Sequence, residues 1–94
     1  MIFSALFKWR IRSLKAMLKD FVNTAAELGL PEKDTDFALD LLSHYEYGEC
    51  FHLVIAQLYE FDIKITNEFY ETIKQLANKM KYSASINHMQ ELVQ

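Results

Sequence analysis

The stretch FKWRIRSLKAMLKDFVNTAAELG, residues 7–29, decides the fold class of this chain. Its apolar residues recur at alternating intervals of four and three positions, which places them on one stripe of an α-helix. Gly29 follows the last of them, and glycine commonly ends a helix because it adopts positive φ without strain. The stretch therefore predicts one long N-terminal helix over residues 7–28. Its apolar stripe consists of Phe7, Ile11, Leu14, Leu18, Phe21, Ala25 and Leu28.

The same spacing predicts further helices along the chain. Pro31 and the acids behind it suit the start of a second helix, and a third follows the junction at residues 44–48 and runs to about Phe61. Thr66 is a good N-cap for a fourth helix and Ser83 for a short fifth. The inward faces are Ala38, Leu41, Leu42 and Tyr45; Phe51, Val54, Ile55 and Leu58; Phe69, Ile73, Leu76, Ala77 and Met80; and Ile86, Met89 and Val93.

The composition agrees with a helical fold. Hydrophobic residues make up 51% of the 94 positions and charged residues 24%, which is typical of a folded globular chain. Only two glycines and one proline occur, too few for the many turns of a β-sandwich or barrel. We therefore expect an all-α fold, a single-domain bundle of four to five helices over residues 1–94 with a long N-terminal helix.

The compartment is inferred from cysteine use and from the apolar runs. Cys50 is the only cysteine, so no intramolecular disulfide can form, which fits a reducing compartment. The apolar run at residues 1–7 is too short for a signal peptide before Lys8, and no run reaches the length of a membrane span. These features predict a cytoplasmic protein without a membrane association.

Charge is distributed unevenly along the chain. Residues 1–19 carry five cations and no acid, whereas residues 27–71 carry eleven acids against Lys33 and Lys64. On the second predicted helix, Glu32, Asp36 and Asp40 follow one another at intervals of four, and each neighbouring pair costs roughly 0.2–0.5 kcal/mol in an isolated helix. The helix dipole offsets this repulsion near the N-terminus, or the row serves as a docking face for a basic partner.

Tyrosines accompany these acids and would supply rigid contact area in an interface. Tyr45, Tyr47 and Tyr59 all lie within the acidic stretch. Some of these rings belong to the core, and we expect Tyr45 to be one of them because it continues the apolar face of the second helix.

The sequence offers little for catalysis or metal binding. The nearest grouping of metal-binding residue types is His44, Glu49, Cys50 and His52, and its spacing matches no known site. Asp40 and His44 are spaced as a base and its orienting acid, but no glycine-rich turn supplies an activated nucleophile or an oxyanion hole. We therefore expect no enzyme activity, no metal and no cofactor.

Three short stretches carry a resemblance to a known family. They are Glu27-Leu28-Gly29-Leu30, Tyr45-Glu46-Tyr47-Gly48-Glu49 and Gln57-Leu58-Tyr59-Glu60-Phe61-Asp62-Ile63. Over residues 27–80 the chain resembles the MafI-type immunity proteins, which accompany polymorphic and contact-dependent growth-inhibition toxins of bacteria. Members of that family often have proline after the Asp-Ile pair, where this chain has Lys64, and the N-terminal helix lies outside the match.

The resemblance implies a helical antitoxin that binds the C-terminal toxin domain of a delivered effector. Toxins of these systems are often basic nucleases, which agrees with the acidic stretch. The candidate toxin-binding residues are Asp36, Asp40, Glu46, Tyr47 and Glu49, with Glu60 and Asp62 as outlying members.

Two other hypotheses place function in the N-terminal helix. One is an adaptor or structural module that forms a homodimer through this helix, and a charge introduced at Leu14 or Leu18 would disrupt that dimer. The other is a regulator that binds nucleic acid through the basic residues 8–19, with an affinity that falls steeply with salt. The acidic remainder of the chain and its pI near 5.5 disfavour direct binding of nucleic acid.

Overall fold

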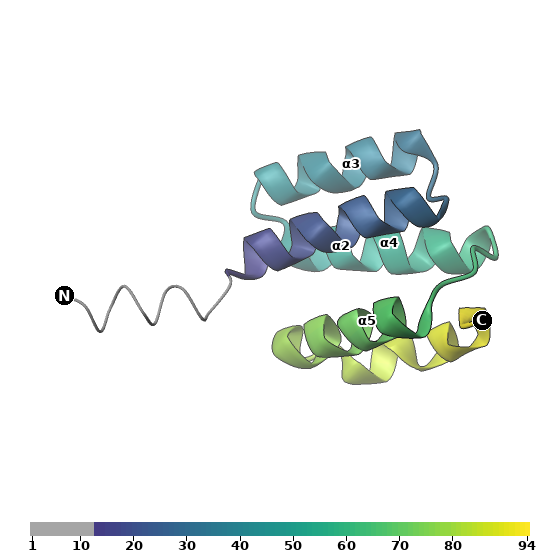
Figure 1. Ribbon diagram of the computed structural model, residues 1–94. Helices are drawn as coiled ribbons and strands as arrows, with labels where there is room; N and C mark the ends of the chain where they lie inside the picture. The colour runs from purple at the N-terminus through teal and green to yellow at the C-terminus, as the bar shows by residue number, and fades with distance from the viewer. Residues whose placement is uncertain (1–12) are drawn as a thin grey trace, which may run out of the picture.

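The computed structural model describes residues 13–94 and confirms the predicted all-α fold (Figure 1). α2, α3 and α4 lie side by side, while α5 and η1 pack together along α2 and α4. Within the described residues the only β-type pairing is an isolated parallel bridge between Ile65 and Val93. The elements are α2 (Leu14–Leu28), α3 (Glu32–Ser43), α4 (Tyr47–Glu60), α5 (Asn67–Met80) and the 3₁₀-helix η1 (Ser83–Leu92).

Local capping explains where the helices begin and end. Ser13 has an extended backbone, and its hydroxyl accepts from the Ala16 N–H at 3.1 Å, so α2 begins at Leu14. The part of the predicted first helix before Ser13, residues 7–12, lies outside the described residues. Gly29 ends α2 with φ 126°, as predicted, and Thr66 caps α5 by accepting from the Phe69 N–H at 3.0 Å.

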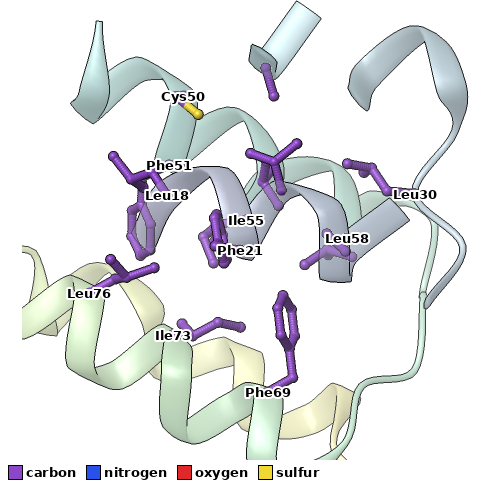
Figure 2. Packing of buried hydrophobic residues seen from close by; sticks show 14 of the residues in the cluster. Leu18, Phe21, Leu30, Cys50, Phe51, Ile55, Leu58, Phe69, Ile73 and Leu76 are labelled. Carbon is purple, nitrogen blue, oxygen red and sulfur yellow. The ribbon is translucent and has the colours of Figure 1, made fainter. Parts of the chain in front are cut away.

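The core is centred on stacked phenyl rings (Figure 2). Phe21 of α2 lies 5.4 Å from Phe51 of α4 and 5.5 Å from Phe69 of α5, measured between ring centroids. Around them the predicted inward faces of α4 and α5 are buried, except Met80, which is half-buried. No polar or charged side chain of residues 13–94 is buried. Apolar burial by three helices around one ring stack therefore holds the bundle together.

The C-terminal segment differs from the predicted short α-helix. It is a 3₁₀-helix, Tyr82 occupies the position before it, and Ser83 lies inside it rather than capping it. Its buried residues are Ile86, Met89 and Leu92, spaced by three, which matches the 3.0 residues per turn of a 3₁₀-helix. Val93 was expected in the core but is half-buried, because it ends η1 in extended backbone beside Ile65.

The prediction that Tyr45 belongs to the core is wrong. α3 ends at Ser43, and Tyr45 takes a left-handed backbone conformation with φ 63°, which turns the chain out of the helical path. Its side chain is 72% exposed. Tyr47, which opens α4, packs against the core instead. The apolar face of α3 therefore stops before Tyr45.

Gly48 lies in the first turn of α4, where space is limited by Tyr82. A Cβ atom built on Gly48 would lie 2.7 Å from the Tyr82 hydroxyl oxygen and 3.6 Å from the ring carbon that bears it. The Tyr82 ring is held by His52, at 4.4 Å between centroids, and by Phe51, at 6.3 Å. The glycine of the Glu46-Tyr47-Gly48 motif thus has a steric role in joining α4 to the C-terminal segment.

This close approach predicts that Gly48 and Tyr82 are energetically coupled. Alanine is favoured over glycine in a helix by about 1 kcal/mol, so Gly48→Ala should stabilise the fold once the hydroxyl is removed by Tyr82→Phe. In the parent chain the clash should cancel that gain, giving a coupling of about 1 kcal/mol in a double-mutant cycle measured by urea unfolding. Additive effects of the two substitutions would contradict the contact.

Candidate binding surface

The outward side of α3 combines acids with an exposed phenylalanine. Ala38 and Leu42 are the buried residues of α3, and the helical repeat places Asp36, Phe37 and Asp40 on the opposite side. Asp36 and Asp40 are exposed, and Phe37 is 53% exposed. A large apolar side chain flanked by carboxylates on a solvent-facing helix contributes little to the core. Such a residue is typical of a docking face.

The α3–α4 junction adds a second exposed ring. The Tyr45 ring lies 6.3 Å from the Tyr47 ring, and the Lys15 ammonium of α2 lies 4.9 Å from the Tyr45 centroid. Left-handed backbone in a non-glycine residue costs roughly 1–2 kcal/mol. The conformation ends α3, where the Tyr45 N–H donates to the Leu42 carbonyl at 3.1 Å. Asp62 and Lys81 take the same conformation after α4 and α5, so it is the exposure of its ring that makes Tyr45 a candidate contact residue.

These residues define what we call the acidic junction surface. The Glu46 N–H donates to the Leu41 carbonyl at 2.9 Å, which keeps the start of α4 against the end of α3. Glu46 and Glu49 are exposed beside this junction. The surface consists of Asp36, Phe37, Asp40, Tyr45, Glu46 and Glu49.

The structure separates the seven residues predicted from sequence into two groups. Asp36, Asp40, Glu46 and Glu49 belong to the acidic junction surface, and Tyr47 lies half-buried beneath it. Glu60 and Asp62 lie at the other end of α4, which has 14 residues and is therefore about 21 Å long. The outlying pair is therefore distant from Glu46 and Glu49 along α4. The start of α3 lies nearer to it, since Gln57 of α4 donates to Asp34 at 3.0 Å.

Sequence reasoning missed Phe37. The residue lies one position before the buried Ala38, and the same offset separates the half-buried Leu41 from the buried Leu42. The sequence did offer one sign of this, because Phe37 is apolar but does not lie on the inward face formed by Ala38 and Leu42. The exposure of Tyr45 had no such sign, since tyrosine is not a residue type that favours positive φ.

Asp40, Ser43 and His44 lie close together but are not arranged for catalysis. His44 Nδ1 is 2.9 Å from the Asp40 carbonyl oxygen, 3.8 Å from Asp40 Oδ1 and 3.2 Å from Ser43 Oγ. A Ser-His-Asp relay needs the acid and the hydroxyl on different ring nitrogens. Here both meet the same nitrogen, and the Ser43 hydroxyl donates to the Asp40 carbonyl at 2.7 Å, so the cluster acts as a cap for the end of α3.

The other residues considered for metal binding diverge. Cys50 is buried in the core, His44 is exposed at the end of α3, and the His52 ring packs against Tyr82 at an interplanar angle of 54°. Across residues 13–94, no three His, Cys, Asp or Glu side chains come together as a metal ion would require. Burial raises the pKa of the Cys50 thiol from 9.0 to about 11, which makes it a poor nucleophile.

Cys50 should therefore resist alkylation in the folded protein. Two pKa units correspond to about a 100-fold lower thiolate fraction at pH 8, and burial slows access further. We expect iodoacetamide to label the native chain at least about 100-fold more slowly than the urea-unfolded chain. Comparable rates in the two states, followed by mass spectrometry, would show that the thiol is accessible.

Comparisons of the chain with protein-family models, with curated proteins and with solved structures find no match. Among the helices in residues 13–94, none has the length and apolar character needed to cross a membrane.

Proposed function

We propose that this protein is an immunity protein that binds the C-terminal toxin domain of a contact-dependent growth-inhibition or related polymorphic toxin and neutralises it by stoichiometric contact. The observation that carries the proposal is the outward side of α3, where the exposed Phe37 accompanies the exposed acids Asp36 and Asp40. The resemblance of residues 27–80 to MafI-type immunity proteins supports it independently of the charge pattern.

The proposed mechanism needs no covalent chemistry. Carboxylates of the acidic junction surface attract a basic toxin, which the resemblance implies is a nuclease, and increase the association rate. Phe37 and Tyr45 then bury apolar area at the centre of the contact and slow dissociation. Protection at low toxin concentration requires a nanomolar dissociation constant, about −12 kcal/mol of binding free energy.

The test is co-purification with the toxin domain encoded immediately upstream, followed by binding kinetics at two salt concentrations. Asp36→Lys should weaken a one-to-one complex by about tenfold at ~0.01 M ionic strength and by less at ~0.15 M, where the Debye length falls to ~8 Å. Glu27→Lys is the matched control, because Glu27 is exposed in the last turn of α2 and the change in net charge is the same. Absence of a complex, or equal losses for both variants, would overturn the proposal.

The strain at Tyr45 allows stability and binding to be separated. Tyr45→Gly relieves the left-handed backbone and removes the ring, so we expect unfolding stability to rise by up to about 1 kcal/mol while toxin affinity falls about tenfold. Lys81→Gly is the control, since Lys81 ends α5 with φ 64°. It should bring a similar gain in thermal unfolding and no change in affinity. A Tyr45→Gly variant that binds normally would exclude the ring from the interface.

The alternative hypotheses concern residues that are largely outside the described part of the chain. Of the predicted basic segment, only Lys15 and Lys19 lie within residues 13–94, and Lys15 contacts Tyr45. Leu18 and Phe21 are buried in the core of their own chain. Within residues 13–94, a homodimer through the N-terminal helix could therefore not use Leu18 or Phe21.

A further inference from the structure

A second surface with exposed aromatic rings lies where the end of α4 meets η1. Tyr59 is 42% exposed and Phe61, which follows the last residue of α4, is 51% exposed. Neither ring belongs to the buried cluster or to the acidic junction surface. We call this the aromatic end surface, and it consists of Tyr59, Glu60, Phe61, Asp62, His88 and Glu91.

The Tyr59 ring is fixed in place from two directions. Its hydroxyl donates to Glu91 Oε1 at 3.3 Å, and the His88 ring lies edge-on to it, with centroids 4.6 Å apart and planes at 85°. Both partners come from η1, so the ring is held between two elements of the fold. A ring that is already ordered loses little side-chain entropy when a ligand packs on it.

The surroundings of the two rings are negatively charged. Glu60, Asp62 and Glu91 are all exposed here, and Lys64 places its ammonium 2.9 Å from Asp62 Oδ1. The negative charge of Glu91 raises the pKa of the Tyr59 phenol most. Slight burial, the hydrogen bond between Tyr59 and Glu91, and the charge of Asp62 raise the same pKa further. The two exposed rings therefore lie in a field that attracts cations.

We propose that the aromatic end surface binds an arginine-rich segment of a partner protein. A guanidinium group stacks its plane on an aromatic face and pairs with a carboxylate through two parallel N–H donors. A lysine ammonium lacks this planar fork and acts as a point charge. Tyr59 supplies an aromatic face next to the Glu91 carboxylate, and Phe61 follows two residues later, between Glu60 and Asp62 in the chain. This surface shares no residue with the acidic junction surface, and the proposal does not depend on the proposed toxin binding.

The test uses two synthetic probes, nona-arginine and nona-lysine, titrated into the full-length chain and followed by backbone amide NMR. We expect nona-arginine to shift residues 59–62 and 88–91 most, and to bind about threefold or more tightly than nona-lysine. Glu91→Gln and Tyr59→Leu should each weaken nona-arginine binding by about threefold or more. Glu71→Gln, the same change at an exposed acid of α5 outside both surfaces, should leave it unchanged.

Three outcomes would overturn the proposal. They are no binding, equal affinity for the two peptides, and shifts spread evenly over the acids of α3 and α4, which would indicate attraction without a site. Glu91→Gln changes a single exposed group, so it keeps the test valid even if Tyr59→Leu lowers stability. Since no toxin is present in the titration, failure here leaves the proposed function unaffected.

Discussion

Replacing Phe21 with alanine should lower the free energy of unfolding by about 3–5 kcal/mol, the largest loss of stability that we expect from one substitution. Phe21 is 1% exposed and stacks on both Phe51 and Phe69, so it joins α2 to α4 and to α5 at once. Removing the ring loses the free energy gained by burying it. It also leaves a cavity that the three surrounding helices cannot fill by moving inward. A domain of this kind has about 5–15 kcal/mol of total stability, so the loss is a large fraction of the free energy of unfolding.

Urea unfolding followed by circular dichroism measures this loss, and Phe37→Ala provides the matched control. The chemical change is the same, but Phe37 lies half in solvent on the outward side of α3. We expect its effect on unfolding to stay within about 0.5 kcal/mol. Similar losses for the two variants would mean that Phe37 belongs to the core and would remove it from the candidate surface.

Much of the fold is predictable from sequence because strong local rules agree with the apolar pattern. The four- and three-residue spacing identified the inward residues of α2, and Gly29 and Thr66 marked helix ends through backbone geometry and capping. The errors fall where no local rule applies. η1 departs from α-helix because its buried residues recur every three positions, and Tyr45 leaves the helical path although tyrosine has no preference for positive φ.

The candidate site was predictable only in part, for a similar reason. The exposure of Asp36, Asp40, Glu46 and Glu49 follows from their charge and from the helical repeat. Phe37 was not assigned to the predicted inward face, but an apolar side chain carries no charge that marks it as a binding residue. The distance of Glu60 and Asp62 from Glu46 and Glu49 follows from the length of α4.

Replacing Phe37 with alanine should weaken toxin binding by about 30-fold or more, which corresponds to about 2 kcal/mol and would make Phe37 a dominant residue of the interface. Phe37 lies beside the stripe of α3 that carries Asp36 and Asp40, because it follows Asp36 by one residue and precedes Asp40 by three. A basic partner that pairs with these carboxylates therefore brings its own surface next to the ring and excludes water from it. Loss of apolar packing acts after encounter, so the dissociation rate should rise while the association rate stays close to that of the parent chain.

Surface plasmon resonance with the immobilised toxin domain separates the two rates, and Phe61→Ala is the matched control on the aromatic end surface. Phe37 and Phe61 are almost equally exposed, at 53% and 51%, so a non-specific loss of surface hydrophobicity would affect both variants alike. We expect Phe61→Ala to leave the toxin complex unchanged and to weaken nona-arginine binding, with the reverse for Phe37→Ala. Equal effects of the two substitutions on the toxin complex would assign Phe37 and Phe61 to one extended interface and would contradict the division into two surfaces.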